Sequence, residues 1–221
     1  MAQAAADARA AVAAALDHPV DSPSLTELAR GKKTAAISVC DITRPAPNKL
    51  TLPLVLERLH AAGIPREGVR ICIATGLHRI ATDAELVEIL GADIAGSYEI
   101  YNHQAKNLDE HVYLGTTASG TPVHIAERFI SADLHITLGF IEPHLMLGFS
   151  GGRKLIAPGL AAAEPPRWFK GDRAALDQGR YLRFAGFLAF SAHRVAGFAR
   201  GRIGLFVARP GRPQRFAVGP V

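Results

Sequence analysis

The strongest constraint on the fold comes from three short apolar runs, at residues 34–40, 69–75 and 134–140. Each run is rich in β-branched and other apolar side chains and ends at a polar or glycine-containing segment. That pattern is typical of a buried strand, because a strand of this composition packs well inside a sheet. The three runs therefore predict three buried strands.

Helical segments alternate with these strands. Residues 48–62 place leucines at helical spacing, and Gly63 ends the pattern. Thr82 and Glu85 have the spacing of a capping box, which predicts a helix running to about Leu90. Alternating strands and helices predict an α/β fold, layered, with a mostly parallel sheet and flanking helices. We also expect a leading helix over 4–17, a strand over 98–103, a turn region over 115–121, and either a strand or a helix over 123–130.

A polar motif follows each predicted strand directly. Because the carboxyl ends of parallel strands lie at one edge of a sheet, where α/β domains bind their ligands, we expect the motifs to meet at one site. Taken alone each motif is weak, since Asp41 or Thr43 could simply cap a helix and His78 could be an ordinary surface residue. The three motifs are Asp41, Ile42, Thr43 and Arg44; Gly76, Leu77, His78 and Arg79; and Glu142, Pro143 and His144.

A fourth polar segment covers residues 148–159 and contains Gly151, Gly152 and Lys154. The two glycines allow backbone amides to approach a ligand closely, which suits a phosphate group. The glycine spacing does not match a Walker P-loop. Lys154 could contact phosphate, serve as a nucleophilic amine, or be a solvated lysine.

Charge is distributed unevenly along the chain. Residues 164–221 hold 11 basic and 3 acidic residues, a net charge of +8, whereas the other 163 residues hold 14 basic and 17 acidic residues. The basic residues of the tail are scattered singly among glycine, proline, alanine and phenylalanine. They form no organised face, so we do not expect nucleic-acid binding.

The remaining composition is that of an ordinary globular protein. Cys40 and Cys72 lie inside apolar runs, which predicts buried small side chains rather than a disulfide or a metal site. No apolar run is long enough to span a membrane, and the alanine-rich start lacks the pattern of a secretory signal. We therefore expect a cytoplasmic location and no membrane partner.

Taken together, the motifs at 41–44, 76–79 and 142–159 are specific. Between residues 41 and 161 the sequence resembles the N-terminal domain of the nickel-dependent lactate racemases. These racemases and epimerases use a nickel-pincer nucleotide, Ni(II)-pyridinium-3,5-bisthiocarboxylate mononucleotide. The resemblance implies a Rossmann-like cofactor-binding domain over 1–163 and a small-molecule 2-hydroxy acid as substrate.

The resemblance also implies roles for particular residues. Asp41, Ile42, Thr43 and Arg44 would line the cofactor and substrate site. Arg44 would hold the substrate carboxylate, a task that suits a planar guanidinium group. His78 and His144 would be the acid/base pair, because imidazole titrates near working pH. Lys154 would anchor the cofactor covalently.

The sequence departs from the family pattern at about residue 164. Family members carry a nickel-ligating histidine a short way past the anchoring lysine, but residues 167–172 contain none and His193 lies too far along. The protein ligand of the metal is therefore unknown. The resemblance further implies a missing C-terminal domain, which another chain could supply. We expect 164–221 to be a divergent basic tail, truncated or frame-shifted; a naturally divergent tail is the alternative.

Two other functions stay open at this point. The chain could be a non-catalytic remnant that at most binds a nucleotide or an anion. It could also be a metal-dependent hydrolase that uses His78, His144 and Glu142.

Overall fold

A computed structural model describes residues 7–20, 22–116, 122–144, 148–163, 202–208 and 216–219. No described helix is long and apolar enough to cross a membrane. The helices are α1 (Ala8–Asp17), α2 (Leu25–Ala29), α3 (Asn48–Ala61), α4 (Asp83–Leu90), α5 (Ala92–Ser97) and α6 (Glu127–Ile130), and the short 3-10 turns are η1 (Arg66–Gly68), η2 (Leu108–Glu110) and η3 (Gly152–Leu155). The strands are β1 (Ala35–Cys40), β2 (Val69–Ala74), β3 (Glu99–Asn102), β4 (His111–Thr116), β5 (Pro122–Ala126), β6 (Leu134–Ile141), β7 (Pro143–His144), β8 (Gly148–Phe149), β9 (Arg202–Ala208) and β10 (Phe216–Gly219).

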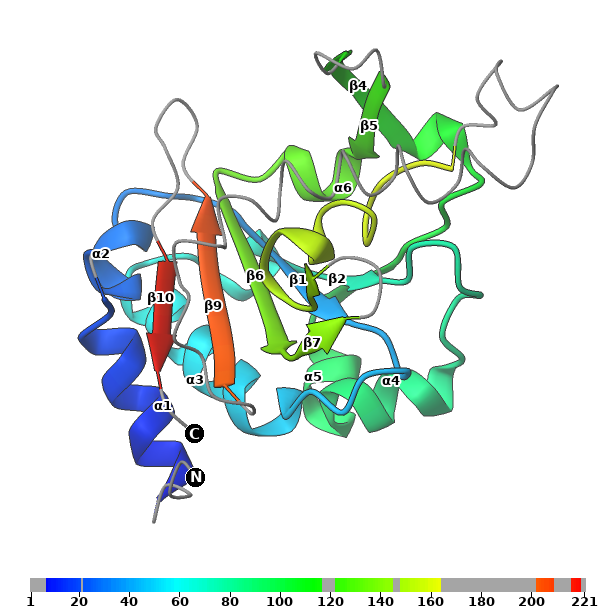
Figure 1. Ribbon diagram of the computed structural model, residues 1–221. Helices are drawn as coiled ribbons and strands as arrows, with labels where there is room; N and C mark the ends of the chain where they lie inside the picture. Colours follow the sequence, from blue (N-terminus) through cyan, green and yellow to red (C-terminus); the bar gives the residue numbers. More distant parts are fainter. Residues whose placement is uncertain are drawn as a thin grey trace, which may run out of the picture.

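The main sheet has the strand order β10-β9-β6-β1-β2-β3 (Figure 1). Strands β6, β1, β2 and β3 pair in parallel, whereas β9 and β10 extend the sheet in antiparallel fashion beside β6. The chain runs from β1 outward through β2 to β3, and β6 then pairs with the opposite edge of β1. The direction of winding thus reverses between β1 and β6. In open α/β sheets a crevice forms beyond the carboxyl ends of the strands at such a switch point.

Alternate residues of the central strands enter two different cores, as the period of two along a strand requires. Ile37 of β1 lies beside Ile71 and Ile136 in the register of the sheet, and all three are fully buried in the larger core. This core also contains residues of α1, α2 and α3. Large apolar side chains at such positions typically contribute about 2–5 kcal/mol to stability when compared with alanine.

The second core lies on the other face of the sheet. Ala36 and Cys72 pack there with Phe129 of α6 and with Leu160, which follows η3. The buried hydroxyl of Ser38 donates a hydrogen bond of 2.9 Å to the backbone carbonyl of Leu155. Both cores are thus formed by strand residues that the sequence marks as apolar, and both cysteines are buried as predicted.

The predicted α/β class with a mostly parallel sheet is confirmed. The three predicted buried strands are β1, β2 and β6, and the predicted strand over 98–103 is β3. The capping box at α4 is formed, because the Thr82 hydroxyl accepts from the backbone amide of Glu85 while the Glu85 carboxylate accepts from that of Thr82. The leading helix is present from Ala8, and residues 4–6 of its predicted span lie outside the described residues.

In four regions the observed secondary structure differs from the sequence-based prediction or adds to it. Residues 123–130, ambiguous between strand and helix, contain both, because β5 continues directly into α6. The predicted turn over 115–121 begins inside strand β4, and residues 117–121 lie outside the described residues. The tail, which lacks sustained periodicity in sequence, contributes strands β9 and β10. Finally, β4 pairs with β5 in a hairpin that stands away from the main sheet at the top of Figure 1.

Candidate active site

The segment after β1 is organised around Asp41, which is buried at the carboxyl edge of the sheet. One oxygen of the Asp41 carboxylate, Oδ1, accepts a 2.6 Å hydrogen bond from the Thr43 hydroxyl and a 3.3 Å bond from the Thr43 backbone amide. Ile42, between them, packs against the larger core. Asp41 is therefore held in a fixed orientation by its own turn, and its second oxygen is left for another partner.

That partner is His78, which arrives from the end of β2. The imidazole Nδ1 lies 2.6 Å from Asp41 Oδ2. A carboxylate can only accept, so Nδ1 carries a proton, and in a neutral imidazole the lone pair is then on Nε2. The His78 side chain is 59% exposed whereas that of Asp41 is 9% exposed, so the carboxylate is fixed and the imidazole faces outward. A neutral histidine in this arrangement can accept a proton from a bound substrate.

Arg44 joins the segment after β1 to the segment after β6. Its Nη1 lies 2.6 Å from Oε1 of Glu142, and the two side chains are 33% and 27% exposed. One edge of the guanidinium is thus used by Glu142. The group remains partly exposed at the sheet edge, where its other N–H donors can reach an anion.

The loop that carries Lys154 is fastened to the end of β6 by Ser150. The Ser150 hydroxyl donates to the backbone carbonyl of Phe140 at 2.7 Å and accepts from the backbone amide of Glu142 at 3.1 Å. Gly151 then adopts a φ of +74°, and a Cβ there would lie 3.0 Å from the Phe140 carbonyl oxygen. A glycine is required at this turn because an L side chain would be strained and crowded.

Lys154 lies half-buried in η3, close to the other charged groups of the edge. Burial lowers the pKa of its amine, and the positive charge of Arg44 lowers it further. The negative charges of Asp41 and Glu142 partly oppose that shift. A lysine with a lowered pKa has more neutral amine near pH 7 and is a better nucleophile.

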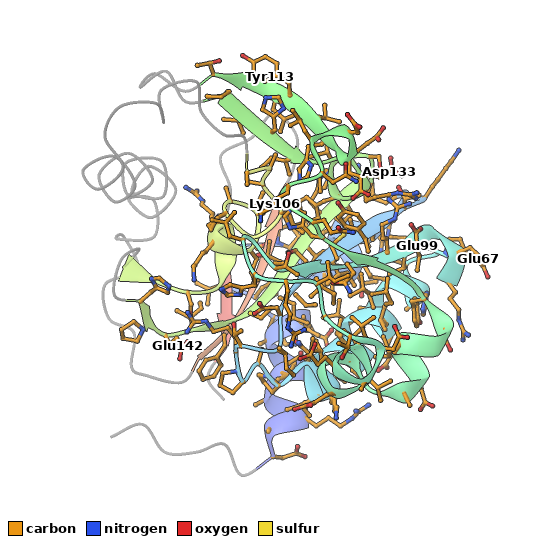
Figure 2. All side chains as sticks on the ribbon, turned by 90° about the vertical axis from the view of Figure 1, so that its right-hand side faces the viewer. Glu67, Glu99, Lys106, Tyr113, Asp133 and Glu142 are labelled. Carbon is orange, nitrogen blue, oxygen red and sulfur yellow. The ribbon has the colours of Figure 1, made fainter. Side chains whose placement is uncertain are left out.

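His144 comes from the short hairpin of β7 and β8. Partial burial lowers the pKa of its imidazole, followed by the positive charges of Lys154 and Arg44, while Glu142 has the opposite effect. These interactions place His144 in the electrostatic neighbourhood of the lysine loop and of the Arg44–Glu142 pair. Figure 2 shows Glu142 at the edge of the molecule, far from Tyr113 in the β4–β5 hairpin.

The sequence-predicted residues are thus brought to one edge from three regions that are far apart in the chain, at 41–44, 76–79 and 142–154. Three features were missed. The sequence placed Asp41 and Arg44 at the site without their contacts with His78 and Glu142, and it gave Ser150 no role. None of these contacts has a sequence signal, because each depends on how the fold brings the two partners together. Among the described residues, no group of three or more His, Cys, Asp or Glu is arranged to hold a metal ion.

These charged and imidazole side chains lie together at one edge of an α/β domain. The family described as the lactate racemase N-terminal domain matches residues 1–165, and the chain belongs to that family. It is 39% identical over 150 residues to a lactate racemase of Thermoanaerobacterium thermosaccharolyticum, which covers 68% of this chain and 35% of the relative. It is 43% identical over 147 residues to a lactate racemase of Lactiplantibacillus plantarum, which covers 66% of this chain and 34% of the relative.

A solved structure agrees with these sequence relationships. The lactate racemase apoprotein from Thermoanaerobacterium thermosaccharolyticum matches with a TM-score of 0.66 and 39% sequence identity, over 70% of this chain and 37% of that chain. The predicted family resemblance is therefore confirmed. The chain spans about a third of the length of the curated relatives it matches.

Proposed function

We propose that this chain is the cofactor-binding part of a racemase or epimerase that acts on a 2-hydroxy acid such as lactate. The observation that supports this most strongly is the Asp41–His78 contact at the same sheet edge as Arg44, His144 and Lys154. Inverting the configuration at C2 requires that the hydrogen on C2 leave as a hydride and return to the opposite face of the planar 2-keto acid. The hydroxyl proton must be removed in the first of these steps and returned in the second. Two bases and a carboxylate-binding group are the minimum that the protein must supply.

His78 and His144 would be the two bases. Asp41 fixes the proton of His78 on Nδ1, so Nε2 can take the hydroxyl proton of one enantiomer. His144, with a lowered pKa, is favoured in its neutral form and can do the same for the other enantiomer. When the substrate re-forms, each imidazolium returns its proton. This assignment requires that the substrate lie between the two rings.

Arg44 would orient the substrate through its carboxylate. The contact with Glu142 restrains the guanidinium, and the remaining N–H donors provide a charge-assisted hydrogen bond to an anion. Holding the carboxylate fixes C2 and its hydroxyl relative to the bases, which makes the proton transfer effectively intramolecular.

The nickel-pincer nucleotide is the cofactor that the family implies, and the lysine loop fits it. Lys154 offers a half-buried amine with a lowered pKa, which suits a covalent anchor. Gly152 has a φ of +50°, and open space lies where a Cβ would be, so the backbone there can approach a phosphate group. When bound, the cofactor supplies the hydride acceptor that the amino acids lack. Asp41, Ile42 and Thr43 would contribute to the wall beside it.

A C-terminal domain, which another chain could supply, would complete the site. The absence of a histidine over residues 167–172 favours a second candidate function, a non-catalytic remnant that binds at most a nucleotide or an anion. The two candidates differ in whether Lys154 acquires the cofactor.

Intact mass measurement decides between them. The chain is co-expressed with the proteins that synthesise the cofactor, and we expect an adduct on Lys154 that is absent from Lys154→Arg. Lys49→Arg, which changes an exposed lysine in α3, should keep the adduct. A bare chain in all three preparations would contradict the proposal and support the remnant.

A further inference from the structure

Two other histidines meet away from the candidate active site. His103, just after β3, is fully buried, and His111, the first residue of β4, is half-buried. Their Nε2 atoms lie 2.9 Å apart, and their rings are inclined by 77° with centroids 5.1 Å apart. Neither residue has a role predicted from the sequence, and neither takes part in the proposed racemisation.

The remaining ring nitrogens both face oxygen atoms. His111 Nδ1 lies 2.8 Å from the backbone carbonyl oxygen of Asn107, which can only accept, so this Nδ1 carries a proton. His103 Nδ1 lies 3.0 Å from the Thr75 hydroxyl oxygen. That hydroxyl donates its single proton to the backbone carbonyl of His103 at 2.7 Å. The Thr75 oxygen therefore accepts from His103 Nδ1.

With both protons on Nδ1, neither Nε2 atom carries a proton, and both lone pairs face the same 2.9 Å gap. This contact is repulsive unless a cation lies between the rings. Turning the Thr75 hydroxyl toward His103 Nδ1 would relieve it, but would leave the 2.7 Å contact between two oxygens without a proton.

We propose that His103 and His111 bind a divalent first-row transition-metal ion through their Nε2 atoms. Imidazole is a preferred ligand of such ions. Two nitrogens at bond lengths of about 2.05 Å lie about 2.9 Å apart when the angle at the metal is about 90°, and about 3.3 Å apart at the tetrahedral angle. Hydrogen bonds from both Nδ1 atoms to oxygen acceptors are the usual support of metal-binding histidines.

The metal would join the hairpin to the edge of the main sheet. No third His, Cys, Asp or Glu among the described residues completes the group, so water fills the other coordination positions. The hydroxyl of Thr75 contacts His103, and the backbone carbonyl of Thr75 accepts a 3.0 Å hydrogen bond from the backbone amide of His78. Metal binding would therefore stabilise the start of the loop that carries His78.

The test uses the full 221-residue chain without an affinity tag. Zn²⁺ binding is measured by calorimetry and equilibrium dialysis for the wild type, His111→Ala and the control His18→Ala, which removes an exposed imidazole at the end of α1. We expect the wild type and His18→Ala to bind one Zn²⁺ that His111→Ala does not bind. Undiminished binding by His111→Ala would overturn the proposal.

Zn²⁺ held by the candidate active site must be distinguished from this ion. The measurement is therefore repeated with His78→Ala and His144→Ala, which should retain the ion that depends on His111. Loss of all Zn²⁺ from either variant would place the binding at the other site and overturn the proposal.

Imidazole nitrogen spectra provide an independent readout. Zn²⁺ should shift both Nε2 resonances while both Nδ1 atoms keep their protons. Thr75→Val, which removes the acceptor for His103 Nδ1, should weaken binding about tenfold. Spectra that are unchanged by Zn²⁺, with one proton shared between the rings, would show a proton as the occupant and overturn the proposal.

Discussion

The two histidine sites of this domain differ in what faces the imidazole. His78 is largely exposed and contacts a buried carboxylate, whereas His103 is fully buried and contacts a hydroxyl and a second imidazole. In the first site a negative charge fixes the ring and leaves Nε2 open toward solvent. In the second, Nε2 lies 2.9 Å from the Nε2 of another imidazole. Under the two proposals the same side chain would transfer a proton in one place and hold a cation in the other.

The largest expected effect is on the rate of racemisation, when one of the two proposed bases is replaced. His78→Ala or His144→Ala should lower racemisation in the reconstituted enzyme at least about a hundredfold, because a general acid/base is lost. Chiral chromatography of the product measures this loss. His18→Ala, which removes an exposed imidazole at the residue after α1, is the matched control. Full activity in either histidine variant would remove that residue from the mechanism.

The next largest effect tests whether the Asp41 carboxylate fixes the proton of His78. Asp41→Asn should lower racemisation about a hundredfold, because the amide no longer fixes the proton on His78 Nδ1. Nitrogen spectra of His78 should show a change of tautomer. Asp93→Asn, on the exposed start of α5, should change neither the rate nor the spectra. An unaltered tautomer in Asp41→Asn would contradict this role.

A smaller effect concerns the charge around Lys154. Burial and Arg44 lower the pKa of this amine, so its neutral fraction is larger at a given pH than that of an ordinary lysine. Reductive methylation followed by mass spectrometry should therefore modify Lys154 at lower pH than its exposure alone predicts. Removing the positive charge with Arg44→Gln should raise the pKa and shift the reactivity profile to higher pH. A profile that moves the other way would contradict the assigned cause.

The smallest effect is on stability. Ser150→Ala leaves the Phe140 carbonyl and the Glu142 amide without their hydroxyl partner, which should lower the free energy of unfolding by about 1–3 kcal/mol. Urea denaturation measures the change. Ser97→Ala, on the exposed last residue of α5, should stay within about 0.5 kcal/mol of the wild type. Equal stabilities would show that the loop is fastened by other contacts.

Much of the fold could be predicted because its signals are local. The apolar runs that become β1, β2 and β6 and the Thr82–Glu85 capping box depend on residues close together in the chain. Strands β4, β9 and β10 could not be predicted in the same way. Strand β4 pairs with β5, β9 pairs with β6, and β10 pairs with β9. The hydrogen bonds of these strands come from their partners, and their own sequences do not indicate them.

The sequence predicted which residues belong to the candidate site, but not which of them contact one another. His78, His144, Arg44 and Lys154 were named from their motifs, and their catalytic and cofactor roles stay predictions. Their order along the chain gave no indication that Glu142 would engage Arg44. Nor did it indicate that Asp41 would face His78.

The sequence by itself determined the α/β class, the three strand ends that are followed by polar motifs, and membership of the lactate racemase N-terminal domain family, because periodicity and motifs are properties of neighbouring residues. Only the tertiary structure decided the partners. Asp41 meets His78 across 37 residues, and Arg44 meets Glu142 across 98. The physical reason is that the strand order of the sheet, and not the distance along the chain, sets which polar groups share an edge. This order brings Asp41 to His78 and so fixes a proton on Nδ1 of that imidazole.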